Sequence, residues 1–161
     1  MRQIPFSPPD ITEEEVREVA DALRSGWITT GPRTKEFEKR IAEYCHTQRA
    51  VCLNSDTACM EMTLRLFGIG PGDEVITTAY TYTATASVIC HTGAVPVLVD
   101  VAEGSYEMDY DALERAVTPK TKAVIPVDIA GVMCDYNRIL DVAERKRDLF
   151  RPRDNRYQKA R

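Results

Sequence analysis

Residues 74–99 read EVITTAYTYTATASVICHTGAVPVLV, and this stretch decides the fold. Both of its ends, 74–77 and 95–99, are short apolar runs rich in β-forming residues, which predict strands. The stretch from Tyr82 to His91 has a helical pattern, and Gly93 is placed to end that helix. A strand, a helix and a second strand in this order predict a right-handed crossover between two parallel strands.

The same alternation of strand and helix continues on both sides of this unit. Apolar runs at 50–53 and 122–127 predict further strands, and helices are expected over 57–67, over 110–117 and after a cap at Asp135. The strands are apolar without alternation, as in a parallel sheet that is covered on both faces. The sequence therefore predicts an α/β fold, with a mostly parallel sheet flanked by helices.

The first part of the chain has a different pattern, with two helices and no strand. Thr12 and Glu15 form a capping box that predicts the start of a helix, and Gly26 is placed to end it. A second amphipathic helix is expected from about residue 35, with an inward face that consists of Phe37, Ile41 and Tyr44.

We therefore expect three parts: a helical arm and loop over 1–48, a partial α/β domain over 49–150 and an irregular basic tail over 151–161. The end of the chain is basic, since residues 144–161 hold eight Lys and Arg against three Asp and Glu. A basic surface could attract nucleic acid. Few aromatic residues interleave here, however, and mixed charges usually form a solvated face, so we expect no nucleic-acid partner.

The composition is that of an ordinary globular protein, with 43% hydrophobic and 29% charged residues. No apolar run approaches the ~20 residues of a membrane span. No apolar segment of a signal peptide follows the N-terminus, so we expect a cytoplasmic location and no membrane partner. The five cysteines are scattered without a C-x-x-C pair, and His46 and His91 have no partners at zinc spacing, which predicts reduced thiols and no metal site.

Ligands of open α/β sheets bind beyond the carboxyl ends of the strands, so the residues after each predicted strand are the candidate site. The first candidate is the turn Asn54-Ser55-Asp56-Thr57-Ala58. Its amides and hydroxyls could cradle a phosphate at a helix N-terminus, or the turn could be a plain helix cap. The residues alone favour the cap, because Asp56 places a negative charge where an anion would lie.

Two other segments follow predicted strands. In 78–85, aromatic and hydroxyl residues alternate, and Tyr80 and Tyr82 could stack on a planar ring or serve only in packing. In 128–131, Asp128 could orient a polar ligand or cap a turn. The glycine-rich segment 68–73 is not a dinucleotide fingerprint, because it follows a helix and precedes a strand, the reverse of the required order.

Six short motifs stand in order along the chain: Gly31-Pro32 with Phe37-Glu38, Asn54 to Ala58, Gly70 to Ile76, Thr81-Tyr82 with Ala84-Thr85, Gly93-Ala94 with Pro96-Val97 and Asp100, and Lys120 to Val127. Each is weak alone, but from Trp27 to about Leu140 they closely resemble the DegT/DnrJ/EryC1/StrS aminotransferases. The resemblance implies the N-terminal part of the large domain of a fold-type I aminotransferase that uses pyridoxal 5'-phosphate (PLP).

By this resemblance, an amino group passes from glutamate or another amino donor to a keto-sugar nucleotide, in cell-surface polysaccharide or antibiotic sugar biosynthesis, and the enzyme is a homodimer. The cofactor-binding residues implied are Ser55, Asp56 and Thr57 at the phosphate and Tyr82 on the pyridine ring. Substrate-binding roles are implied for Trp27, Thr30, Gly31 and Asp128. Two positions depart from the family, which usually has glycine in place of Asp56 and commonly histidine in place of Asp128.

The resemblance also implies that the Schiff-base lysine and the aspartate that pairs with the pyridine nitrogen lie outside the matched residues. The lysine moves the proton and the aspartate keeps the ring nitrogen protonated, so without them we expect no catalytic residue in this chain and no transamination by it alone. Two alternatives remain open. The chain could be a non-catalytic partner subunit of a full-length homologue, or a fragment of a PLP sugar dehydratase or lyase of the same fold.

Overall fold

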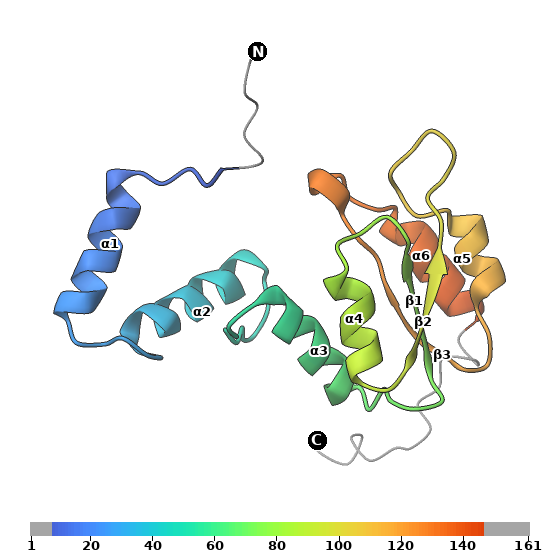
Figure 1. Cartoon of the computed structure of the whole chain (residues 1–161), viewed down its shortest axis with the longest axis horizontal. Coiled ribbons are helices and arrows are strands. Elements are labelled where there is room, and N and C mark those ends of the chain that lie inside the picture. The colour runs from blue at the N-terminus through green and yellow to red at the C-terminus, as the bar shows by residue number, and fades with distance from the viewer. Residues whose placement is uncertain (1–7, 147–161) are drawn as a thin grey trace. The chain divides into compact units, whose positions relative to one another are not determined.

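The structure is a computed structural model, and it describes residues 8–146. The chain divides into two compact units, Met1–Cys52 and Leu53–Arg161. Figure 1 shows only helices in the first unit, and a parallel sheet with helices in the second. None of the helices within 8–146 combines the length and the apolar character needed to cross a membrane.

The first unit holds α1 (Glu13–Arg24) and α2 (Pro32–Tyr44). The predicted capping box is confirmed: the Thr12 amide donates to Oε2 of Glu15 at 2.6 Å, and the Thr12 hydroxyl accepts from the Glu14 amide at 3.2 Å. A surface ion pair of 3.0 Å between Arg33 and Glu18 links the two helices.

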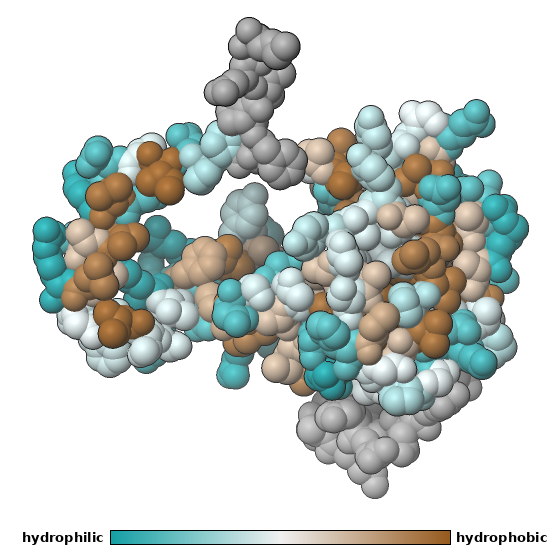
Figure 2. Space-filling model, viewed as in Figure 1, coloured by the Kyte–Doolittle hydropathy of each residue, from teal (hydrophilic) through white to brown (hydrophobic). Residues whose placement is uncertain are grey.

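The apolar face of α2 differs from the prediction, and the apolar side chains of α1 are exposed as well. Neither helix has a buried residue, and the predicted inward side chains of α2 (Phe37, Ile41 and Tyr44) are all exposed. Figure 2 shows brown, hydrophobic side chains gathered along α1. The amphipathic pattern correctly predicts both helices, but burial of such a face also needs an apolar partner, and two short helices cannot cover each other fully.

The sheet of the second unit has three parallel strands in the order β2-β1-β3. These strands are β1 (Glu74–Thr78), β2 (Val95–Val99) and β3 (Thr121–Ile125). The predicted crossover between β1 and β2 is confirmed, with α4 (Ala84–His91) between the strands. The helix begins two residues later than predicted, after Thr83, which caps it without a side-chain hydrogen bond.

Helices cover both faces of the sheet, as predicted. Val75 and Ile76 are adjacent on β1 and completely buried on opposite faces, because successive side chains of a strand alternate. Val75 packs with residues of α3 (Asp56–Leu66) and α4, whereas Ile76 packs with residues of α5 (Tyr110–Ala116) and α6 (Tyr136–Arg145). Figure 1 shows these two helix pairs on opposite sides of the strands.

The prediction of a strand at 50–53 is wrong. This segment has no regular structure, and its Val51 side chain is 74% exposed. The Cys52 amide donates to Oε1 of Glu38 at 2.9 Å instead of to a strand. A β-strand needs a neighbouring strand for its hydrogen bonds, and within residues 8–146 the three strands β2, β1 and β3 pair only with one another. An apolar run alone does not provide that neighbour.

Candidate functional site

The carboxyl ends of all three strands meet at one edge of the sheet because the strands are parallel. The segment 79–83 leaves this edge from β1, and the Ala79 amide extends the ladder by donating to the Val99 carbonyl at 2.7 Å. Asp128 follows β3 and precedes the 3-10 turn η1 (Ile129–Gly131). The sheet therefore brings Tyr80, Tyr82 and Asp128 to the same edge, as the sequence predicted.

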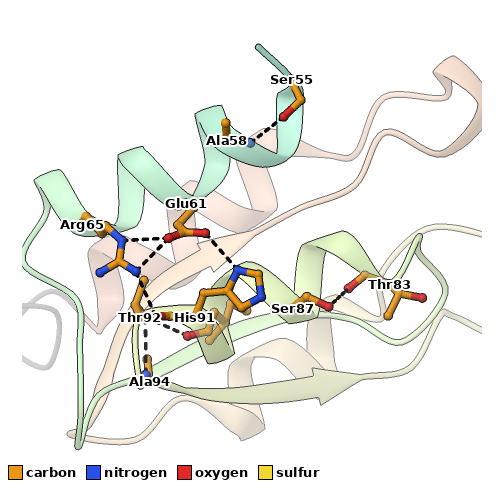
Figure 3. Close-up of polar contacts among 10 residues, drawn as sticks. Ser55, Ala58, Glu61, Arg65, Thr83, Ser87, His91, Thr92 and Ala94 are labelled. Carbon is orange, nitrogen blue, oxygen red and sulfur yellow. Dashed lines mark hydrogen bonds and ion pairs between the residues drawn. The ribbon is translucent and has the colours of Figure 1, made fainter. Parts of the chain in front are cut away.

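The start of α3 faces the same edge. Only residues 67–73 connect the end of α3 to the start of β1, so the helix must run antiparallel to that strand. Its 11 residues span about 16 Å, roughly the length of the five-residue strand. Figure 3 shows that α3 and α4 run side by side in the same direction, so Ser55 and Thr83 lie at corresponding ends of the two helices.

Ser55 caps α3 in extended backbone conformation, and its Oγ accepts from the Ala58 amide at 3.1 Å. The hydroxyl proton points to Oδ1 of Asn54 at 3.3 Å. The amides of Asp56 and Thr57 are the first two of the helix and have no intrahelical acceptor. The cap and an anion site are therefore compatible, because the Ser55 oxygen serves Ala58 and leaves two amides at the positive end of the helix.

The helices α3 and α4 are joined by an ionic cluster near their C-terminal ends. Glu61 on α3 accepts from Arg65 at 2.8 Å, and its other oxygen lies 2.9 Å from Nδ1 of His91 on α4. Arg65 also donates to the His91 carbonyl at 3.0 Å, as Figure 3 shows. The hydrogen bond from Arg65 and then that from His91 hold the pKa of Glu61 below its usual value. This cluster fixes the position of α3, and so of its N-terminus, against α4.

We expect Glu61→Gln to lower the Tm of the chain at neutral pH. A carboxyl whose pKa is depressed in the folded state stabilises the protein above its unfolded pKa, and this contribution disappears as pH falls through the folded pKa. The difference in Tm between wild type and variant should therefore be present at pH 7 and shrink below about pH 4.5. Thermal unfolding followed by circular dichroism at several pH values measures it.

Glu103→Gln is the matched control, because Glu103 lies in an exposed loop and has no ion-pair partner among residues 8–146. It should leave the Tm unchanged at every pH. An equal effect of the two substitutions would show that the loss of Tm reflects overall charge and not the cluster.

Tyr82 has the most exposed ring of this edge, with 82% of the residue open to solvent. Tyr80 is engaged differently, since its ring stacks on that of Tyr106 with centroids 5.4 Å apart and planes 24° apart. The Thr81 and Thr85 hydroxyls are hydrogen-bonded at 3.0 Å, which ties the segment to the first turn of α4. An open aromatic face therefore stands beside hydroxyl groups that are already paired.

Asp128 closes the loop that follows β3. One of its oxygens accepts from the Cys134 amide at 2.9 Å, and the other accepts from the Tyr136 hydroxyl at 3.0 Å. These contacts span the turn in which Ala130 has a φ of 51°, and the bond from Cys134 is the main reason that the pKa of Asp128 is lowered. Loop closure thus employs both oxygens of this carboxylate, and a role for Asp128 in substrate binding stays a prediction.

Trp27, Thr30 and Gly31 lie in the first unit, between α1 and α2. A Cβ on Gly31 would lie 3.0 Å from Cε3 of Trp27, so the indole packs directly on this glycine. Thr30 is exposed beside them. The structure therefore brings Trp27 and Gly31 together, and their participation in a substrate site stays a prediction.

Sequence reasoning missed three residues whose contacts position these elements: Tyr106 near the candidate site, and Glu61 and His91, which join α3 and α4 toward their C-terminal ends. The four-residue spacing from Glu61 to Arg65 would have indicated a helical ion pair. His91 and Tyr106 reach their partners only through the fold, and no local pattern indicates them. Within 8–146, no group of three or more His, Cys, Asp and Glu side chains could hold a metal ion.

Comparison with known proteins identifies the family and agrees with the fold. Residues 9–149 match the DegT/DnrJ/EryC1/StrS aminotransferase family. The chain is 48% identical over 141 residues to the spore coat polysaccharide biosynthesis protein SpsC of Bacillus subtilis (strain 168). The aligned residues cover 88% of this chain and 36% of SpsC. It is 45% identical over 142 residues to the UDP-4-amino-4-deoxy-L-arabinose--oxoglutarate aminotransferase of Shewanella sediminis (strain HAW-EB3), covering 88% of this chain and 37% of that enzyme.

A similar fold is seen in Spr1654 of Streptococcus pneumoniae, whose name places it among the sugar aminotransferases. Its PLP form has a TM-score of 0.91 and 58% identity, over 98% of this chain and 40% of that one. The chain thus spans 36–40% of the length of these relatives and has the fold of the N-terminal part of a fold-type I aminotransferase. With 9–149 matched, the chain belongs to the DegT/DnrJ/EryC1/StrS aminotransferase family.

Proposed function

We propose that this chain is the N-terminal fragment of a PLP-dependent aminotransferase that acts on a keto-sugar nucleotide, with glutamate or another amino donor. Family membership supports the reaction, and the names of SpsC and of the arabinose enzyme support polysaccharide biosynthesis and a nucleotide sugar. A cytoplasmic location and a homodimer belong to the same proposal. In it, the chain by itself holds PLP without a covalent bond and does not transaminate.

The observation that carries the proposal is the free N-terminus of α3. Two amides without intrahelical acceptors, the Thr57 hydroxyl and the positive end of the helix dipole suit a phosphate group, and the Ser55 hydroxyl can donate to it by turning from Oδ1 of Asn54. Tyr82 offers an exposed aromatic face at the same edge of the sheet, suited to a planar ring. The residues present thus fit PLP, which in such enzymes serves as an electron sink for the reacting carbon.

In this arrangement, residues 55–57 would hold the phosphate and Tyr82 would cover one face of the ring. The charge of Asp56 opposes this role. Asp56 is exposed in the first turn of α3, where its carboxylate interacts favourably with the helix dipole in the absence of ligand. A bound phosphate would compete with that carboxylate for the same positive end, so we expect the affinity to be lower than a neutral residue here would allow.

Two substitutions test the phosphate site, one that adds a negative charge beside it and one that removes a negative charge. Ser55→Asp retains a side-chain cap for α3 but places a negative charge beside the phosphate, so PLP binding should weaken by about tenfold or more. Asp56→Asn removes a negative charge, and binding should tighten about two- to fivefold. Equilibrium titration of the 161-residue chain with PLP, followed by tyrosine fluorescence and by absorbance, measures both changes.

Thr12→Asp is the control, since Thr12 caps α1 as Ser55 caps α3 but lies in the other unit. It should leave PLP affinity unchanged. The proposal fails if Ser55→Asp binds PLP as the wild type does while circular dichroism shows an intact fold.

A further inference from the structure

Tyr82 has an exposed ring, and its hydrogen bond to the Thr85 amide is made by its backbone carbonyl. Its ring makes no aromatic or hydrogen-bonding contact with another of residues 8–146, so the path of segment 79–83 decides where the ring lies. The contacts that fix segment 79–83 therefore affect where Tyr82 lies in the proposed PLP site. The inference below rests on the proposed function.

The segment is anchored at both ends by hydrogen bonds. At its start, the Ala79 amide donates to the Val99 carbonyl at 2.7 Å. At its end, the Thr81 hydroxyl is bonded to that of Thr85 at 3.0 Å, and the Thr85 amide donates to the Tyr82 carbonyl at 3.1 Å. Between these anchors, the Tyr80 amide has only a long contact of 3.3 Å to the Thr78 hydroxyl, within its own strand end. The stack of Tyr80 on Tyr106 adds a long-range contact to this middle part.

Tyr106 belongs to a braced loop between β2 and α5. The loop is closed by a bridge between Val101 and Met108. Glu107, the next residue, accepts from the hydroxyl of Tyr110 at 2.9 Å, and that hydroxyl accepts from the Asp135 amide at 2.6 Å. Tyr110 is 7% exposed, and its burial raises the pKa of the phenol to about 12, so it remains a donor to Glu107 across the physiological range. The loop that carries Tyr106 is thus held by hydrogen bonds to α5 and, through Tyr110, to the N-terminal cap of α6.

We propose that Tyr106 is a positioning residue for the cofactor side of the site: by stacking on Tyr80, it fixes the segment that carries Tyr82. Tyr106 does not itself need to touch the ligand. Its effect is to order the segment before the ligand arrives, which lowers the entropy cost of placing the Tyr82 ring on a planar partner. A paired aromatic contact of this kind is strong enough to change affinity by about fivefold.

The first test uses the chain without ligand. Backbone NMR relaxation should give Tyr82 an order parameter near ~0.85 in the wild type and below ~0.6 in Tyr106→Ala. Tyr106→Phe keeps the ring and should restore the order, whereas a purely structural defect would appear equally in the melting temperature of both variants. Unchanged order at Tyr82 in Tyr106→Ala, or the same loss in Tyr106→Phe, would overturn the proposal.

The second test separates this inference from the proposed function. PLP should bind Tyr106→Ala about fivefold more weakly than wild type, inorganic phosphate should bind both equally, and Tyr44→Ala, an exposed tyrosine of the other unit, should behave as wild type. Equal PLP affinity of wild type and Tyr106→Ala would refute the positioning role. If the wild type binds no PLP but the order of Tyr82 falls as expected, the proposed function fails and the positioning role stands.

Discussion

Replacing Leu113 by alanine is expected to lower the free energy of unfolding by about 2–5 kcal/mol. Leu113 lies on α5, is completely buried and belongs to the core cluster that Ile76 of the central strand shares with Met108 and Ile139. Truncation removes buried apolar surface and leaves a cavity between helix and sheet, and the close-packed surroundings relax only partly. Urea unfolding followed by circular dichroism measures the loss.

Leu140→Ala is the matched control, because Leu140 lies on α6 of the same layer but is 63% exposed. It should change the free energy of unfolding by less than about 0.5 kcal/mol. A similar loss in the two variants would mean that the face of the sheet under α5 and α6 is not the core described here.

The second large effect is expected at Gly93, which ends the crossover helix. Gly93 has a φ of +83°, and an added Cβ would lie 2.9 Å from Cγ of Pro71. Alanine would therefore suffer both the left-handed backbone, which costs about 1–2 kcal/mol, and a clash with a ring that cannot rotate away. We expect Gly93→Ala to lower the free energy of unfolding by about 2–4 kcal/mol in the same urea experiment.

Gly68→Ala separates the two causes. Gly68 also has a positive φ, of +70°, but nothing lies within 4 Å of its added Cβ, so this variant should lose only the backbone part, about 1–2 kcal/mol. If Gly68→Ala lowers the free energy of unfolding as much as Gly93→Ala does, the contact with Pro71 contributes nothing to stability.

The contact between Gly93 and Pro71 also joins two of the sequence motifs, those around Gly70–Ile76 and Gly93–Val97, into one structural feature.

The sequence predicted the crossover unit well because its information is local. A continuous apolar strand, a helix closed by Gly93 and a second apolar strand are sufficient to specify β1, α4 and β2. The strand at 50–53 was wrongly predicted because strand pairing depends on a partner that lies elsewhere in the chain. The exposed apolar faces of α1 and α2 show the same limit, since periodicity indicates a helix and the side it would bury, but not what covers that side.

In the candidate site, too, the features set by local sequence were predictable and the long-range contacts were not. Ser55 and Thr57 could be proposed from a helix-capping turn after an apolar run, and Tyr82 from its place after a strand. The long-range contacts of Glu61 with His91 and of Tyr80 with Tyr106 span 30 and 26 residues and leave no sequence pattern. For Asp128, the residues alone allowed a ligand role or a capped turn. The structure shows the turn closure, with both carboxylate oxygens engaged.

We infer that this chain carries the phosphate-holding half of a PLP site, built on the N-terminus of α3. The most direct test compares PLP with pyridoxal, which has the same ring and aldehyde but no phosphate, in equilibrium titrations of the 161-residue chain. We expect PLP to bind at least about tenfold more tightly than pyridoxal, because a phosphate at a helix N-terminus gains charge-assisted hydrogen bonds. Equal affinity for the two compounds, or no detectable binding of PLP, would contradict it.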